Sequence, residues 1–126
     1  MLVAVLTSEL VTRSRIAAAA ERLEVAAEFA SSADELVNLV RDRSAELVIL
    51  DLDEPGLQPA QLVSALRASG ASGLRVVAFG PHVHEARLQA ATAAGCDRVF
   101  ARGKFYAELD AVLQGGKVAA LTREEP

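Results

Sequence analysis

The stretch Glu46-Leu47-Val48-Ile49-Leu50-Asp51-Leu52-Asp53-Glu54-Pro55-Gly56 decides the fold class of this chain. Its first part, Leu47–Leu52, is nearly continuous in apolar residues rather than alternating, which is typical of a strand covered on both faces. Two further carboxylates and a Pro-Gly pair follow, and Pro and Gly favour a turn. The sequence therefore predicts a buried strand that delivers Asp51 to the loop at its carboxyl end.

Short apolar runs of the same kind recur along the chain, and longer segments with helical spacing separate them. The runs predict four further strands, at Leu2–Leu6, Val25–Phe29, Leu74–Phe79 and Arg98–Ala101. Apolar residues three and four positions apart predict five intervening helices. Their expected starts are a Ser8 cap, a Ser32 cap, Pro59, about His84 and about Lys104, and their expected ends lie near Leu23, Val40, Gly70, Ala94 and Leu113.

Local end signals support these helix boundaries. Serine is a preferred N-cap residue, and Glu35, three residues after Ser32, would complete a capping box. Pro59 suits the first turn of a helix, and Gly95 would end the fourth helix. The strand-helix order is typical of a parallel sheet with helices on both faces. We therefore expect a three-layer α/β fold with its ligand site beyond the carboxyl ends of the strands.

Composition narrows the class of protein. The chain has 126 residues, 52% hydrophobic, 24% charged and 4% aromatic, with a formal net charge of −4. This apolar content excludes a disordered chain, and no apolar run reaches the roughly 20 residues that a membrane span needs. An acidic chain with few aromatic residues lacks the basic, stacking surface that nucleic acids require. We expect one domain over residues 1–116, a tail or helix extension over 117–126, and a cytoplasmic location away from membranes.

Two segments resemble the receiver domains of bacterial response regulators. In residues 46–56 a buried strand delivers an aspartate shortly before a Pro-Gly turn, as in that family's phosphorylation segment. Residues 93–105, Ala-Ala-Gly-Cys-Asp-Arg-Val-Phe-Ala-Arg-Gly-Lys-Phe, are similar to the family's Ala-Gly-Ala-Asp segment and its Lys-Pro-Phe switch. The resemblance spans essentially the whole chain. It implies a flavodoxin-like (CheY-like) fold with a five-stranded parallel sheet of order 2-1-3-4-5 and five helices, and it makes Asp51 the equivalent of the phosphoacceptor.

The chain departs from this family at residues that carry the chemistry. Family members hold Mg²⁺ with the phosphoacceptor and an acidic pair after the first strand, whereas the matching positions here are Thr7 and Ser8. The hydroxyl residue that follows the family's fourth strand is replaced by Gly80. The family's lysine aligns with Arg102, which keeps the positive charge and would pair with Asp51, even bidentately.

Three nearby residues would compensate for these losses. Glu9 would have to turn inward, or Asp53 take an unconventional role, to supply an oxygen ligand for Mg²⁺. Lys104 would replace Arg102 as the partner of Asp51 if the loop were displaced. Without such compensation Asp51 pairs with Arg102, and Asp53 and its acidic neighbour are solvated loop residues.

His82, His84 and Cys96 are weaker candidates for chemistry. The two histidines would form a transition-metal set with Asp53 only in an extended segment, and Pro81 instead favours a helix entry there. Cys96 has no internal disulfide partner and is expected to be a small, inert residue. No G-x-G-x-x-G or G-x-S-x-G motif occurs, so nucleotide binding and nucleophile-elbow hydrolysis have no anchor.

The sequence favours an atypical receiver, or pseudo-receiver: a protein-interaction module of two-component signalling, not an enzyme and without a cofactor. The first alternative is a working single-domain response regulator that uses Mg²⁺ and is phosphorylated on Asp51. The second is a small flavodoxin-like protein that binds a metal or another ligand. The expected partner is another protein, or a second copy bound through the fourth helix, the fifth strand and the fifth helix, as is common in this family.

Overall fold

Five parallel strands form one sheet in the computed structural model, which describes residues 1–70 and 72–114. The strands are β1 (Leu2–Leu6), β2 (Ala26–Ala30), β3 (Leu47–Asp51), β4 (Arg75–Gly80) and β5 (Arg98–Ala101). Their order is β2-β1-β3-β4-β5, and every neighbouring pair is parallel. The register aligns Asp51 with Phe79 and Gly80 with Ala101, so the carboxyl ends of β3, β4 and β5 lie side by side at the same end of the sheet. The predicted class and strand order are confirmed.

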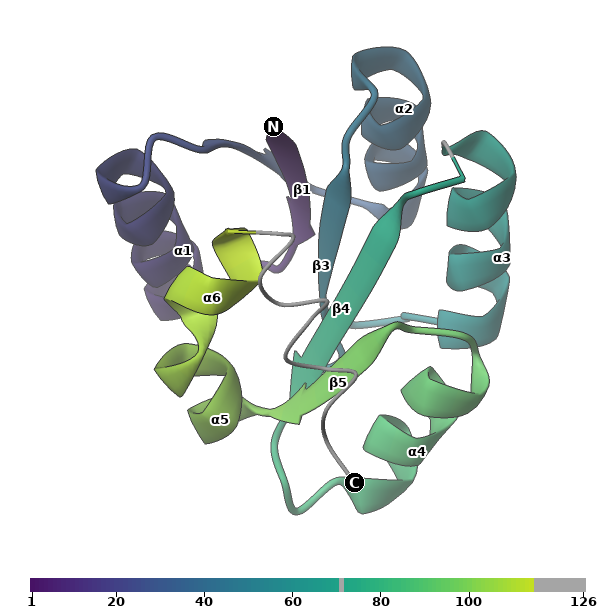
Figure 1. Ribbon diagram of the computed structural model, residues 1–126. Helices are drawn as coiled ribbons and strands as arrows, with labels where there is room; N and C mark the ends of the chain where they lie inside the picture. The colour runs from purple at the N-terminus through teal and green to yellow at the C-terminus, as the bar shows by residue number, and fades with distance from the viewer. Residues whose placement is uncertain (71, 115–126) are drawn as a thin grey trace.

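Helices cover both faces of this sheet (Figure 1). On one face lie α1 (Leu10–Arg22), α5 (Arg102–Ala107) and α6 (Leu109–Leu113), and on the other lie α2 (Ala33–Arg43), α3 (Pro59–Ser69) and α4 (Glu85–Ala93). The predicted end signals hold for three helices. Ser32 caps α2 by accepting the N–H of Glu35, α3 begins at Pro59, and Gly95 follows α4 with φ +102°.

The alternation of side chains along each strand sorts the core into two layers. In β1 and β3, the residues Val3, Val5, Leu47 and Ile49 pack with α1, α5 and α6, whereas Ala4, Leu6, Val48 and Leu50 pack with the other three helices. The same alternation turns the side chain of Asp51 towards the face of α1 and α5. Position 80, at the end of β4, falls on the opposite face, against α3 and α4.

Two predicted boundaries near the start of the chain are wrong. The N-cap of α1 is Glu9 and not Ser8, because the Glu9 carboxylate accepts the N–H of Thr12 at 3.0 Å. The second strand begins at Ala26, one residue later than predicted. Glu24 is in the left-handed region with φ 59°, and the N–H of Val25 bonds to Ala20 in the turn that ends α1.

The predicted fifth helix is in fact two short helices. It starts at Arg102, two residues earlier than predicted, and breaks at Glu108, where φ is −107° and ψ is 12°. The structure therefore has six helical segments within residues 1–70 and 72–114 rather than five. The expected tail at 117–126, and the last two residues of the expected domain at 1–116, lie outside the described residues. No helix within the described ranges is long and apolar enough to cross a membrane.

Candidate functional site

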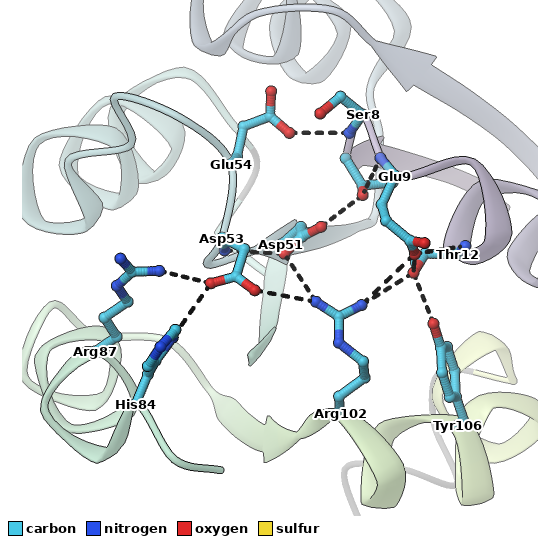
Figure 2. Close-up of polar contacts among 11 residues, drawn as sticks. Ser8, Glu9, Thr12, Asp51, Asp53, Glu54, His84, Arg87, Arg102 and Tyr106 are labelled. Atoms are coloured by element: carbon cyan, nitrogen blue, oxygen red, sulfur yellow. Dashed lines mark hydrogen bonds and ion pairs between the residues drawn. The ribbon is translucent and has the colours of Figure 1, made fainter. Parts of the chain in front are cut away.

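Asp51 lies almost fully buried at the carboxyl end of β3, with 2% of its surface exposed. Both of its carboxylate oxygens accept hydrogen bonds from the protein. The Thr7 hydroxyl donates to Oδ2 at 2.7 Å, and the N–H of Asp53 donates to Oδ1 at 2.9 Å (Figure 2). A buried carboxylate needs such donors and a nearby cation, because burial without them strongly disfavours its charge.

The cation is Arg102, which stands at the first position of α5 and reaches across the strand ends. Its guanidinium nitrogens lie 3.7 Å from Asp51, 3.3 Å from Asp53 and 3.7 Å from Glu9. The guanidinium carbon also lies 5.2 Å from the centre of the Phe79 ring. The predicted pairing with Asp51 is therefore present, but it is not bidentate. One guanidinium instead serves three carboxylates from two segments of the chain, the end of β3 with its following loop and the start of α1.

A hydroxyl network holds Arg102 from the side of α1. The Thr12 hydroxyl lies 3.1 Å from Arg102 Nη1 and 2.7 Å from the Tyr106 hydroxyl, and it also contacts the Glu9 carboxylate. A hydroxyl has one proton, and a carboxylate can only accept. Thr12 therefore donates to Glu9, and it accepts from both Arg102 and Tyr106 (Figure 2).

These contacts change the pKa values of Glu9 and Arg102, the two charged groups that contact Thr12. The hydrogen bonds from the side chain and backbone of Thr12, with a smaller contribution from the charge of Arg102, lower the pKa of Glu9. Burial opposes the charge of Arg102. The hydrogen bond with Tyr106 and the negative charge of Asp51 outweigh that effect and raise the Arg102 pKa. Both groups therefore stay ionised through the neutral range.

Asp53 is not a solvated loop residue, contrary to the expectation from sequence. Its Oδ1 accepts from Arg87 at 2.5 Å and lies 3.4 Å from His84 Nδ1, while its Oδ2 lies 3.3 Å from Arg102. Its acidic neighbour Glu54 is also engaged, because it accepts the N–H of Ser8 at 2.9 Å. The loop after β3 is thus bound to the loop between β1 and α1, to α4 and to α5.

The donor set does not fit Mg²⁺. That ion requires several oxygen ligands in near-octahedral geometry, whereas Thr7 uses its proton on Asp51 and the exposed Ser8 contributes its backbone N–H to Glu54. Glu9 is held as the helix cap, so it does not turn inward as a ligand. In the part of the chain that the structure describes, no group of three or more His, Cys, Asp or Glu is placed to hold a metal ion.

Gly80 lies at the end of β4, and its Cα faces apolar side chains rather than an open pocket. A Cβ added there would lie 3.3 Å from Leu52 Cβ and 3.6 Å from Leu88 Cδ2. Contacts of 3.3 Å are tighter than normal carbon packing, so neighbouring groups would have to move. A side chain at position 80 would therefore meet Leu52 and Leu88.

We expect Gly80→Thr to destabilise the fold by about 1 to 2 kcal/mol, because it inserts atoms into a filled site. Urea unfolding followed by circular dichroism measures the change. Gly103→Ala is the matched control, since a Cβ at Gly103 meets nothing within 4 Å; the control should be neutral or slightly stabilising in its helix. An unchanged midpoint for Gly80→Thr would contradict this reading of the packing.

The remaining candidates lie outside this cluster or play a minor part in it. Lys104 forms an ion pair with Glu108 at 2.9 Å along its own helix, so it does not replace Arg102. His84 stands at the entry to α4 beside Asp53, whereas His82 is exposed, so the two histidines and Asp53 do not form the metal set. Cys96 is half-buried, and burial raises the pKa of its thiol to about 11, which agrees with an inert residue.

Three members of the cluster were not predicted from the sequence: Thr12, Arg87 and Tyr106. Each had a weak signal in its spacing. Thr12 lies three residues after the cap of α1, Arg87 lies three residues after His84, and Tyr106 lies four residues after Arg102. Such spacings place side chains on one helix face, but they do not indicate which partner from another segment meets them.

The fold defines a CheY-like α/β protein, and comparison with solved structures agrees. A response regulator from Burkholderia pseudomallei, solved with a phosphorylated aspartic acid, a calcium ion and citrate, has a TM-score of 0.76 at 20% identity, over 98% of this chain and 72% of that chain. A response regulator from Hahella chejuensis has 0.77 at 22% identity, over 90% and 92%. A CheY-like receiver domain from Methanospirillum hungatei has 0.77 at 12% identity, over 99% and 98%.

The particular fold is therefore that of response-regulator receiver domains, as the resemblance in sequence implied. No model of a known protein family and no curated protein matches the chain.

Proposed function

We propose that this chain is a receiver-fold protein-interaction module of signalling whose state is not set by Mg²⁺-dependent phosphorylation of Asp51. The observation that carries the proposal is the position of Arg102, whose guanidinium lies within 3.7 Å of Asp51, Asp53 and Glu9. Arg102 aligns with the family's lysine, but here its guanidinium also engages Asp53 and Glu9, the two carboxylates that would otherwise be available to hold a metal ion beside Asp51.

The chemistry of the transfer supports the same proposal. An oxygen of Asp51 would have to attack the phosphorus atom of a donor in line with the leaving group. Both Asp51 oxygens already accept hydrogen bonds, and the residue is 2% exposed. At the neighbouring strand end, Gly80 offers no hydroxyl to the phosphoryl group. Attack by an Asp51 oxygen is therefore hindered by burial, and the transferred phosphoryl group lacks the hydroxyl contact that the family supplies.

The test is incubation of the protein with acetyl phosphate and Mg²⁺, followed by intact mass spectrometry. We expect the mass of the wild-type chain to stay unchanged while a phosphorylatable receiver domain, treated in parallel, gains a phosphoryl group. Asp51→Asn is the matched control for the site. If the wild type gains one phosphoryl group stoichiometrically and Asp51→Asn does not, the chain is a working response regulator and the proposal is wrong.

The proposed partner is a protein, and its specific form is a second copy docked through α4, β5 and α5. The outward side of α4 supports this surface, because only Ala91 of that helix is buried and small residues such as Ala86 and Ala90 are exposed. Light scattering over a range of concentrations tests it. We expect the mass to rise with concentration and Ala90→Glu to suppress the rise, whereas Ala17→Glu on the opposite face should not. A mass that stays monomeric excludes the second copy.

A further inference from the structure

The first turn of α4 has few apolar anchors. Ala91 is the one buried residue of this helix, and Leu88 is half-buried. The N-cap residue His84 makes no side-chain capping bond, and Val83 just before it is 72% exposed. Helices in proteins are held in place mainly by an apolar face packed on the core. The first turn of α4 therefore depends on other contacts.

Those contacts converge on one carboxylate, that of Asp53. Arg87 donates to Oδ1 at 2.5 Å, and His84 Nδ1 lies 3.4 Å from the same oxygen. Oδ2 faces the other way, towards Arg102 at 3.3 Å (Figure 2). One oxygen of Asp53 thus serves α4, and the other serves the cation at the start of α5.

Asp53 and Arg102 are less exposed than the members of ordinary surface pairs. Their side chains are 31% and 26% exposed, whereas Arg41 and Asp42 are each more than half exposed. On the α4 side Arg87 is 54% exposed, so Asp53 is the shielded member of that pair. Partial burial weakens the screening of charge by water. The position of Asp53 is further fixed, because its N–H donates to the buried Asp51 carboxylate.

We propose that Asp53 couples the position of Arg102 beside Asp51 to the attachment of α4. Because both elements are held by the same carboxylate, a partner that draws Arg87 away changes how firmly Asp53 holds Arg102, and the reverse holds by linkage. Asp53 is thus a positioning residue: a change at the α4 surface alters its contact with Arg102, and a change at Arg102 alters its contact with Arg87. The inference goes beyond the proposed function, and it does not depend on whether Asp51 accepts phosphate.

Hydrogen exchange measured by mass spectrometry tests the α4 side of this coupling. In Asp53→Asn we expect amides of residues 84–90 to exchange roughly three- to tenfold faster than in the wild type, from the loss of contacts of this kind, with β1 and β3 unchanged. Glu54→Gln is the matched control, because Glu54 lies in the same loop but binds the N–H of Ser8 instead of α4. Equal exchange in α4 of the wild type and Asp53→Asn, or equal acceleration in both variants, overturns the proposal.

The effect on Arg102 is tested with a variant outside the β3–α3 loop. Arg87→Gln removes the ion pair between α4 and Asp53, and it leaves the side chains of Asp53 and Arg102 unchanged. We expect the side-chain Nε–Hε signal of Arg102 to shift in ¹⁵N-edited spectra, since Asp53 is then free to move towards it. Arg41→Gln, on the exposed pair with Asp42, controls for the loss of a surface charge. If the chemical shift of Arg102 changes in neither variant, or changes equally in both, the α4 contact of Asp53 is not coupled to Arg102 and the proposal is wrong. A failure of the phosphorylation proposal would leave both readouts unaffected.

Discussion

Arg102→Met is expected to lower the free energy of unfolding by about 2 to 3 kcal/mol near neutral pH. Removing one partner of a buried ion pair typically costs about 3 to 5 kcal/mol, because the other charge is left uncompensated. Arg102 is 26% exposed and its contacts to the carboxylates are 3.3 to 3.7 Å, so we place the effect below that range. Methionine keeps an unbranched apolar side chain but removes the guanidinium, together with its contact with the Phe79 ring. The change therefore reports the loss of the whole guanidinium group, and urea unfolding measures it.

The same variant should show an altered dependence of stability on pH. In the wild type, hydrogen bonds from Thr12 and the charge of Arg102 lower the pKa of Glu9. A lowered carboxyl pKa contributes stability above its unfolded value, and that contribution is lost as pH falls. Without Arg102, Glu9 loses one of the contributions that lower its pKa, so this stabilisation is smaller in the variant. The deficit of the variant should therefore be largest at neutral pH and shrink as pH falls towards about 4.

Two substitutions frame this prediction. Arg102→Lys keeps a positive charge and should recover part of the loss, although a single ammonium cannot reach Asp53 and Thr12 as the planar guanidinium does. Arg41→Met removes an exposed arginine that pairs with Asp42 and donates to Asn38 on the surface, and it should cost at most about 0.5 kcal/mol. If Arg102→Met costs no more than Arg41→Met, the guanidinium is not the cation that permits the burial of Asp51.

Phe105→Ala is expected to cost about 3 to 5 kcal/mol, the usual range for truncating a buried aromatic ring. Phe105 is fully buried, and its ring stacks on Phe79 with centroids 4.3 Å apart. It also contacts Phe100, at a centroid distance of 6.2 Å. A small domain has only about 5 to 15 kcal/mol of stability, so this one change would remove a large share of it.

Loss of the Phe105 ring should also loosen the position of Arg102, because Phe105 is the one buried residue of α5, the helix that begins at Arg102. Urea unfolding followed by far-ultraviolet circular dichroism measures the loss, since the chain has no Trp. Phe105→Leu fills most of the cavity and should cost about 1.5 kcal/mol or less. Phe29→Ala, at a half-buried position of β2, should cost about 1 kcal/mol. A loss for Phe105→Ala no greater than that of Phe29→Ala would contradict the central packing role of the ring.

Local pattern was sufficient to predict most of the fold. The continuous apolar run before Asp51 predicts a strand covered on both faces, and β3 is buried throughout. Ser32, Pro59 and Gly95 predict helix ends correctly, because capping depends on hydrogen bonds and backbone angles within a few residues. Where the pattern failed, at the start of α1, two residues in a row had suitable N-cap chemistry. Ser8 and Glu9 can both accept a backbone N–H, and the structure uses the Glu9 carboxylate, which accepts the N–H of Thr12. The N–H of Ser8 is bound instead by Glu54, a contact between distant parts of the chain.

The candidate site divides in the same way. The sequence by itself determined that Asp51 and Arg102 would stand at the carboxyl ends of two strands of one parallel sheet, β3 and β5, and that Thr7, Ser8 and Gly80 lack the groups a metal-dependent phosphorylation site uses. Only the tertiary structure decided that Arg102 serves Asp51, Asp53 and Glu9 together, and that Arg87 joins them from α4. The apolar pattern of a strand shows where the strand ends, so local sequence is enough to place a residue at its carboxyl end. The reach and direction of long charged side chains depend on which segments the fold brings within a few ångströms, and no local pattern encodes that.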